Sequence, residues 1–149
     1  MSSEMREISY MSPKVIDGLE ILRGKPSSAA IELKGEKLLH LRTNRKIKNG
    51  TAISVEDIKN LPKIIANPLV VLDDTEKKNL LYAFEAKDKD QMGKVVVEVD
   101  IEETIMHNGI RIKRLLNEII SAGLVPVANL KNQPHYIPIP QSGSLWHTW

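Results

Sequence analysis

The spacing of apolar residues divides the chain into short helices followed by strands. Ser12-Pro13 suits the cap and the first position of a helix that ends before Gly24. Its apolar residues recur at helical spacing: Val15, Ile16, Leu19 and Leu22. Residues 29–33 and 38–41 are short apolar runs, and they predict either a hairpin or a strand followed by a helix.

Residues 54–74, SVEDIKNLPKIIANPLVVLDD, predict a short helix, a turn and a strand. Ser54 can cap a helix whose first turn carries two acidic residues, which favour the positive end of the helix dipole. Pro62 can begin a second helical turn. Pro68 disfavours helical backbone at the residue before it, so residues 69–72 are predicted to be a strand.

The second half of the chain predicts a hairpin, one late helix and a last strand. Residues 80–86 and 94–101 form the two strands of the hairpin, and alternation in the second gives a buried and an exposed face. A helix ended by Gly123 is predicted from the spacing of Ile110, Leu115, Leu116, Ile119 and Ile120. Residues 124–130 are predicted to be a core strand.

This order of elements predicts an α+β fold, with N-terminal helices packed on a small antiparallel sheet. Residues 1–132 form the predicted single domain. Residues 133–149 are rich in proline and aromatic residues and predict an extended tail. That tail can pack on the domain, remain free or insert into a partner.

The composition is that of an ordinary globular protein, with 149 residues, 42% of them hydrophobic and 27% charged. The absence of cysteine excludes disulfides, thiolate metal sites and a cysteine nucleophile. No apolar run is long enough to span a membrane, and the first residues lack the apolar segment of a signal peptide. We therefore expect the protein to act in the cytoplasm, its own or that of a target cell, without a membrane partner.

The net charge of +2 is unevenly distributed. Residues 34–48 hold one acidic residue, Glu36, and six basic ones: Lys34, Lys37, Arg42, Arg45, Lys46 and Lys48. Such a basic segment can attract phosphates, although charge alone favours a solvated surface loop.

Several segments in order resemble a known phage family. They are the basic segment ending KIKNG, then ISVEDIKNLPKIIANPLVVLDD, then the two strands LLYAFEAKD and GKVVVEVDI, and finally HNGIRIKRLLNEIISAGLVPVANLKN. Together they resemble the C-terminal domain of Mu-type phage head-morphogenesis proteins, grouped with nuclease toxins related to barnase, EndoU, colicin-type tRNases and RelE. The resemblance covers residues 30–132 and implies a barnase/EndoU/colicin/RelE-like fold.

The resemblance also implies a metal-independent endoribonuclease without a cofactor, acting on tRNA or another structured RNA. Such an enzyme needs a base for the 2′-OH, an acid for the leaving 5′-oxygen and cations for the transition state. Many relatives carry a Lys-His pair before the helix of residues 54–59. Here that place reads Lys46-Ile47-Lys48-Asn49-Gly50, with lysine and without histidine.

Candidate site residues follow from the charge pattern and this resemblance. The candidate catalytic residues are Lys46, Lys48, His107 and Arg111. The candidate RNA-binding residues are Arg42, Arg45, Lys113 and Arg114. His107 is the preferred base because it precedes a turn with several cations close in sequence. No histidine spacing typical of a metal site is found, so no catalytic metal is expected.

The other candidates have a structural explanation that the sequence favours. His40 lies in an apolar run, and His135 and His147 lie in the predicted tail. Tyr82 and Tyr136 can stack on a base, but Tyr82 lies within a predicted core strand. Glu98 and Asp100 share one side of a strand and can serve as a base, although an exposed sheet face is the explanation that the sequence favours.

Two further functions remain open at this stage. A catalytically inactive phage or mobile-element domain would bind RNA or a protein, with Trp146 and Trp149 available for docking. An immunity-type inhibitor usually has a strongly acidic surface, which residues 70–105 supply only in part. The expected partners are therefore RNA, in particular tRNA, and a cognate antitoxin or immunity protein; DNA is not expected.

Overall fold

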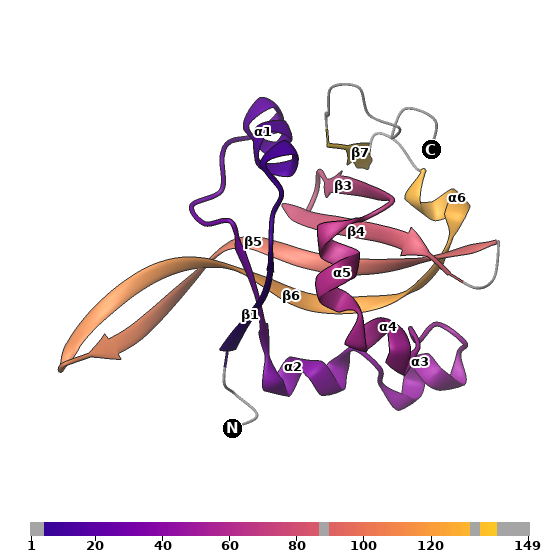
Figure 1. Cartoon of the computed structure of the whole chain (residues 1–149), viewed down its shortest axis with the longest axis horizontal. Helices are drawn as coiled ribbons and strands as arrows, with labels where there is room; N and C mark the ends of the chain where they lie inside the picture. Colours follow the sequence, from indigo (N-terminus) through magenta and orange to yellow (C-terminus); the bar gives the residue numbers. More distant parts are fainter. Residues whose placement is uncertain (1–4, 87–89, 132–134, 140–149) are drawn as a thin grey trace.

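A computed structural model of the chain describes residues 5–86, 90–131 and 135–139. The first half contains β1 (Met5–Tyr10), α1 (Pro13–Leu22), β2 (Ala30–Lys34), α2 (Gly35–His40), α3 (Asn44–Lys48), α4 (Val55–Lys59) and α5 (Leu61–Ala66). The second half contains β3 (Val70–Asp74), β4 (Asn79–Glu85), β5 (Gln91–His107), β6 (Ile110–Pro126), α6 (Val127–Leu130) and β7 (Tyr136–Pro138). Figure 1 shows the strands in one twisted sheet with the helices around it.

The described strands form one seven-stranded sheet in the order β1-β2-β6-β5-β4-β3-β7. Neighbouring strands are antiparallel except β2 and β6, which are parallel. The α+β class is therefore confirmed. The sheet, however, is mixed and larger than the small antiparallel sheet that the sequence predicts, and β1 and β2 lie before and between the helices. These differences arise because strand pairs between distant segments carry no local sequence signal.

The sheet is buried on both faces. Alternate residues of the central strands belong to two separate apolar clusters, so the clusters lie on opposite faces. The larger cluster includes residues of α1 and α5, represented by Leu19 and Ile65. The smaller cluster includes Leu130 of α6.

The predicted starts of the helices at Ser12, Ser54 and Pro62 are confirmed. The Ser12 hydroxyl accepts a hydrogen bond from the Val15 amide at 3.2 Å, and the Ser54 hydroxyl accepts one from the Asp57 amide at 3.0 Å. Pro62 lies in the first turn of α5, as predicted. Residues 29–41 form a strand followed by a helix, which decides between the two alternatives.

The helix predicted over residues 110–120 is wrong, because this segment is strand β6. Its apolar residues fit both a helical and a strand pattern. The segment is a strand because it pairs with β5 along nearly its whole length. Asn108 and Gly109 form the turn between the two strands with positive φ angles of 51° and 78°, which suits a tight hairpin. The predicted strand over 124–130 is also wrong in part: β6 ends at Pro126 and α6 follows.

The hairpin of β5 and β6 extends far beyond the rest of the sheet (Figure 1). In residues 101–116, here called the arm, the two strands pair only with each other among the described residues. Several apolar side chains of the arm are exposed: Ile105, Met106, Ile110, Ile112 and Leu115.

A buried asparagine connects three segments at the base of the arm. Asn117 is fully buried, and its amide group donates to the carbonyl oxygens of Ser28 at 2.6 Å and Ala30 at 3.0 Å. Its side-chain oxygen accepts a hydrogen bond from the Asp100 amide at 3.1 Å. Asp100 has a φ of 56° where the pairing of β5 and β6 shifts register. Asn117 therefore joins the start of β2, the bulge of β5 and strand β6.

Three glutamates lie side by side across the sheet next to Asn117. Glu118 of β6 pairs with Glu32 of β2 and with Glu98 of β5. Glu118 is only 4% exposed, and its Oε1 atom has no hydrogen-bond partner. Burial raises the pKa of the Glu118 carboxyl, although Lys34 and Lys37 act in the opposite direction.

We expect the Asn117→Ala substitution to destabilise the fold by about 3 kcal/mol, because it leaves two carbonyls and one amide without their partner. Urea denaturation measures the difference. The control is Asn129→Ala in α6, where the side chain is exposed and the change should stay within about 0.5 kcal/mol. An Asn117→Ala protein as stable as this control would contradict the assigned role.

We expect Glu118→Gln to stabilise the protein at pH 7 by about 1 kcal/mol, because it removes a buried charge with an unpaired oxygen. A carboxyl whose folded pKa is raised contributes stability below its unfolded pKa and loses that contribution as pH rises through the folded value. The gain should therefore shrink when thermal unfolding is measured near pH 4. Glu85→Gln, at an exposed position, serves as the control. A less stable Glu118→Gln protein at pH 7 would mean that the lysines hold Glu118 as a favourable anion.

Candidate functional site

The structure places the four candidate catalytic residues in two separate regions. Lys46 and Lys48 lie in α3, whereas His107 and Arg111 lie near the tip of the arm. Figure 1 shows α3 and the arm at opposite ends of the longest axis of the molecule. The preferred base and the candidate lysines therefore do not form one site in this structure.

The ammonium group of Lys46 is held by hydrogen bonds within the protein. It donates to the carbonyl oxygen of Ala122 at 2.6 Å, and it lies 3.3 Å from the Ser121 hydroxyl and 3.4 Å from the carbonyl oxygen of His40. Burial lowers the pKa of Lys46, and the charge of Lys94 lowers it further. These contacts attach α3 to strand β6.

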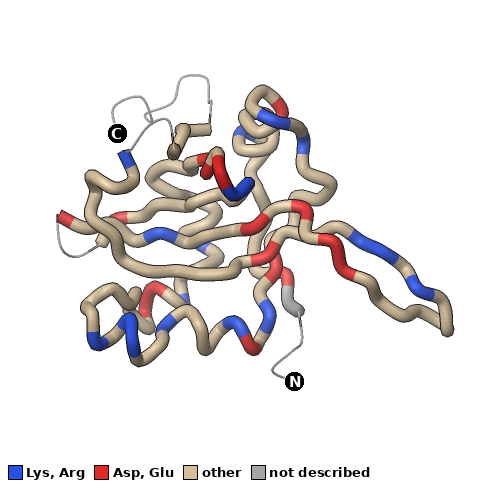
Figure 2. The backbone as a smooth tube through the Cα atoms, turned by 180° about the vertical axis from the view of Figure 1, so that it is seen from behind, with Lys and Arg blue, Asp and Glu red and all other residues tan. Residues whose placement is uncertain are grey.

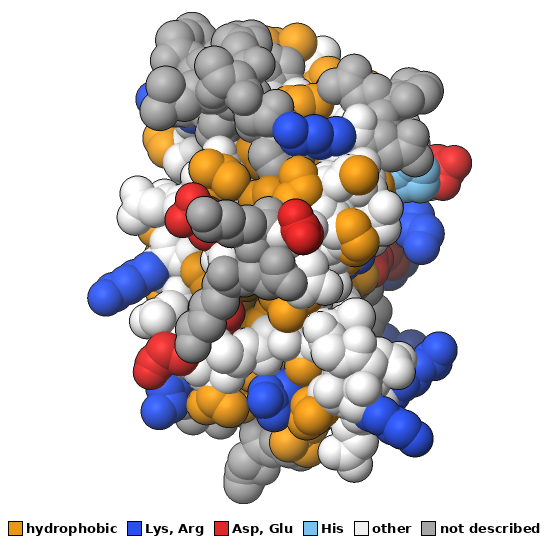
Figure 3. All heavy atoms as spheres, turned by 90° about the vertical axis from the view of Figure 1, so that its right-hand side faces the viewer, with side chains coloured by type: hydrophobic (Ala, Val, Ile, Leu, Met, Phe, Trp, Pro, Cys, Tyr) orange, Lys and Arg blue, Asp and Glu red, His pale blue; other side chains and the backbone are white. Residues whose placement is uncertain are grey.

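The basic residues around Lys46 form a surface with exposed apolar side chains. The Nε atom of Arg42 donates to the carbonyl oxygen of Ile53 at 3.1 Å. Arg45 and Lys48 are exposed, and no ion pair with either is found in the described part of the chain. Figure 2 shows basic positions along α2 and α3, and in Figure 3 basic and hydrophobic side chains lie next to each other on the lower part of the molecule. We call Arg42, Arg45 and Lys48 the basic helical surface.

The candidate RNA-binding residues of the arm are paired with carboxylates. Lys113 lies 3.3 Å from Glu102, and Arg114 lies 3.4 Å from both Glu32 and Glu103. These pairs neutralise much of the positive charge that the sequence suggests for the arm. Arg111, near the tip, is exposed and forms no ion pair within the described residues.

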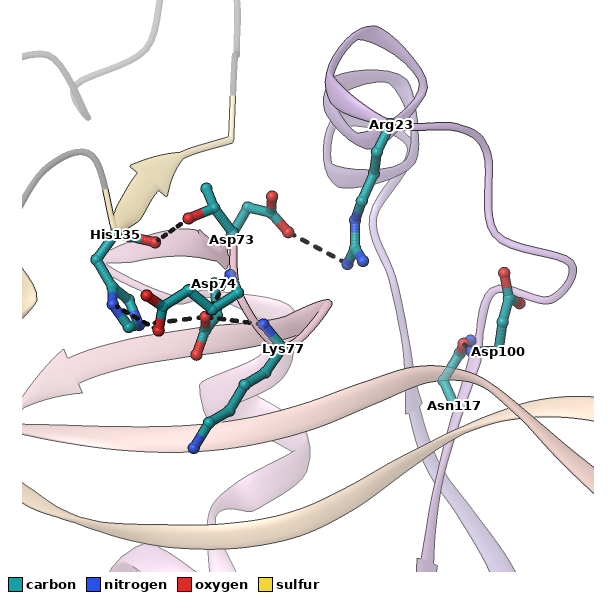
Figure 4. A network of polar contacts seen from close by, with 9 residues as sticks. Arg23, Asp73, Asp74, Lys77, Asp100, Asn117 and His135 are labelled. Carbon is teal, nitrogen blue, oxygen red and sulfur yellow. Dashed lines mark hydrogen bonds and ion pairs between the residues drawn. The ribbon is translucent and has the colours of Figure 1, made fainter.

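The structure also forms a cluster that the sequence analysis missed (Figure 4). Oδ1 of Asp74 accepts hydrogen bonds from the backbone amides of Glu76 at 3.0 Å and Lys77 at 3.2 Å. The same oxygen lies 3.2 Å from Nε2 of His135, and Nδ1 of His135 lies 3.2 Å from Oε2 of Glu76. The side chain of Asp74 is 7% exposed, that of His135 27% and that of Glu76 67%.

The backbone around His135 is held in place by the same turn. Its carbonyl oxygen accepts hydrogen bonds from the amide and the hydroxyl of Thr75, both at 3.0 Å. The next residue, Tyr136, pairs with Asp74 in the sheet, and the rings of His135 and Tyr136 have centroids 4.3 Å apart. Burial raises the pKa of Tyr136, and the charges of Asp74 and Glu76 add to this effect.

Two further ionisable groups lie near this cluster. Asp73 forms an ion pair with Arg23 of α1 at 3.2 Å, and burial nevertheless raises the pKa of the Asp73 carboxyl. Burial lowers the pKa of Lys94, and Lys77 adds to this effect while Asp74 opposes it. Asp73 and Asp74 are successive residues of β3, so the Asp73–Arg23 ion pair lies on the opposite face of the sheet from the Asp74 side chain.

The remaining candidates are placed as follows. Tyr82 is fully buried, its hydroxyl has no hydrogen-bond partner and burial raises its pKa, so it is not available for stacking. Glu98 lies opposite Glu118 in the sheet, and the Asp100 carboxylate accepts a hydrogen bond from the Ser27 amide at 3.0 Å. A bulge between Glu98 and Ile101 interrupts the alternation of the strand, so Glu98 and Asp100 do not share one regular face. His40 is exposed on α2. His147 and the two tryptophans lie outside the described residues.

The composition of residues 133–149 places His135 in an extended tail, and its partners Asp74, Thr75 and Glu76 lie about 60 residues earlier in the sequence. In the described residues 135–139, Tyr136–Pro138 is strand β7, and Ile139 joins the larger apolar cluster. The local sequence after β3 is typical of a turn, and a turn carries no information about a distant histidine. None of the described helices has the length and apolar character needed to cross a membrane.

Comparison with known proteins identifies one family. Residues 42–122, more than half of the chain, match the phage MuF C-terminal domain. No curated protein and no solved structure matches the chain. The matched region runs from the start of the basic helical surface through the arm and includes Asp74 and Glu76, but it ends before His135. The phage part of the resemblance seen in the sequence is thus confirmed, and the chain belongs to the phage MuF C-terminal domain family.

Proposed function

We propose that this phage domain binds RNA through the basic helical surface and does not cleave it. The observation that carries the proposal is the pair of exposed cations, Arg45 and Lys48, on one short helix whose neighbour Lys46 is fixed to the sheet. A helix held in this way presents its cations at defined positions. Phosphate groups are the ligands that such a surface attracts through counterion release.

Arg and Lys have different parts in this surface. The guanidinium group of Arg45 can bind a phosphate with two parallel hydrogen bonds, whereas Lys48 acts as a point charge. Arg42 already donates its Nε hydrogen to the Ile53 carbonyl, which fixes the orientation of its guanidinium group. The exposed Leu39 and Ile47 next to these cations offer apolar contacts to sugars and bases.

Binding without cleavage is favoured by the separation of the candidate catalytic groups. Transesterification requires a base, an acid and cations within hydrogen-bond reach of one phosphate. Here α3 and the arm are at opposite ends of the molecule, and both ring nitrogens of His135 face protein carboxylates. RNA bound on α3 would meet no histidine from the arm.

A metal-independent endoribonuclease is the second candidate, and one observation favours it. Lys46 lies between the exposed cations of α3 in sequence, and burial lowers its pKa. A lysine that releases its proton more easily, next to a hydroxyl such as that of Ser121, is a suitable base. Cleavage would then leave 2′,3′-cyclic phosphate ends.

We expect the double substitution Arg45→Ala and Lys48→Ala to weaken RNA binding at least about tenfold and to lower the salt slope of log Kd by about 2, one for each lost phosphate contact. Fluorescence anisotropy with a labelled tRNA at several salt concentrations measures both quantities. The matched control removes two exposed lysines in and just after α1, Lys14→Ala and Lys25→Ala. Equal binding by the parent and the α3 variant would overturn the assigned surface.

The second experiment separates binding from cleavage. The protein is incubated with tRNA in EDTA, together with Lys46→Ala, Lys48→Ala and His107→Ala variants, and the RNA ends are analysed. We expect intact RNA in every sample. Products with 2′,3′-cyclic phosphate ends that disappear in Lys46→Ala would contradict the binding-only proposal and support the endoribonuclease.

A further inference from the structure

We propose that Asp74, Glu76 and His135 bind a divalent metal ion of the zinc type, which fastens strand β7 to the turn between β3 and β4. Each of the three residues offers one ligand atom, and these atoms all lie within 4.8 Å of one another. Imidazole and carboxylate are ligands that zinc accepts in proteins. The site is independent of the basic helical surface, so its test does not depend on the proposed RNA binding.

The argument begins with the two nitrogens of the His135 ring. Each lies 3.2 Å from a carboxylate oxygen, one from Asp74 and the other from Glu76. A neutral imidazole has one N–H donor and one nitrogen with a lone pair. A neutral His135 would therefore direct a lone pair at a carboxylate oxygen. A cation at the cluster removes this repulsion, and it can be a proton or a metal ion.

The geometry suits a metal ion. Ligand atoms at about 2.0–2.1 Å from a tetrahedral zinc ion lie about 3.3 Å from each other. The 3.2 Å separation between Oδ1 of Asp74 and Nε2 of His135 is close to this value. The exposed side chain of Glu76 is free to move its carboxylate from Nδ1 towards the same ion. A fourth position remains for water.

Two of the ligands are held before any ion binds. Backbone amides of Glu76 and Lys77 fix the carboxylate of Asp74. Thr75 fixes the backbone of His135 through two hydrogen bonds. Outer contacts of this kind orient metal ligands and increase the affinity of a site.

The ion would connect residues inside the region that matches the family to a histidine outside it. Asp74 and Glu76 lie within the region that matches the phage family, whereas His135 lies beyond its end. Strand β7 contains only three residues, and its pairing with β3 is its connection to the sheet in the described chain. A metal ion at this point would therefore add a further connection between strand β7 and the turn after β3.

The test uses the full chain after EDTA treatment and dialysis, with zinc added alone and measured by isothermal titration calorimetry. We expect one equivalent of zinc to bind and the unfolding temperature to rise with zinc concentration. Glu76→Gln, at an exposed position that leaves the fold intact, and His135→Ala should each weaken binding at least about tenfold. His107→Ala, which removes an exposed histidine from the arm, should bind as the parent does.

A second measurement follows the histidine rings of the parent protein by NMR, so the result does not depend on whether a variant folds. Addition of zinc should shift the ring signals of His135 and leave those of His40 and His107 in place. A parent protein that binds no zinc, or a His135 ring that remains doubly protonated when zinc is present, would show that the cation of this cluster is a proton and would overturn the proposal. Zinc binding unchanged in both Glu76→Gln and His135→Ala would overturn it as well.

Discussion

The fold depends on the way one buried asparagine joins the two halves of the chain. Asn117 uses both ends of its amide group, and its three partners are Ser28 just before β2, Ala30 at the start of β2 and Asp100 in the bulge of β5. The parallel pairing of β2 with β6 occurs at the same place, over Ile31↔Asn117 and Glu32↔Glu118. Burying a side-chain amide costs free energy unless its N–H and C=O groups form hydrogen bonds. The three hydrogen bonds of Asn117 therefore favour one arrangement of the three segments over others. The direction in which the arm leaves the sheet follows from that arrangement.

The elements with local signals could be predicted from the sequence. Ser12 and Ser54 begin helices because their hydroxyls satisfy amides three residues later, which needs no information from the rest of the chain. Strand β6 was not predictable in the same way. Its apolar residues satisfy a helical period as well as a strand period, and pairing along nearly the whole of β5 decides between them. The parallel partner of β6 lies 86 residues earlier in the sequence, beyond the reach of any local pattern.

The surroundings of the candidate site residues could be predicted from the sequence only in part. The basic residues of α3 are exposed as their sequence suggests, but nothing in the sequence shows that Lys46 turns inward to the carbonyl of Ala122. The cations of the arm are close in sequence to His107, yet Lys113 and Arg114 are occupied by glutamates on neighbouring strands. His135 shows the opposite error: its position in a proline-rich segment suggests an extended tail, whereas the fold places it between two carboxylates. In each case the missing information is which strands are neighbours.

The pairing of β2 with β6 has a consequence for how the chain folds. The β5–β6 hairpin needs only the two-residue turn at Asn108 and Gly109, and its formation costs little loop entropy. The β2–β6 pair closes a loop of more than eighty residues, and native contacts of such large sequence separation slow folding. The hairpin is therefore expected to form early, with its apolar residues exposed, and β2 to join late. During that interval the edge of β6 that β2 later covers is open to pairing with another chain, which makes this edge the point where aggregation competes with folding.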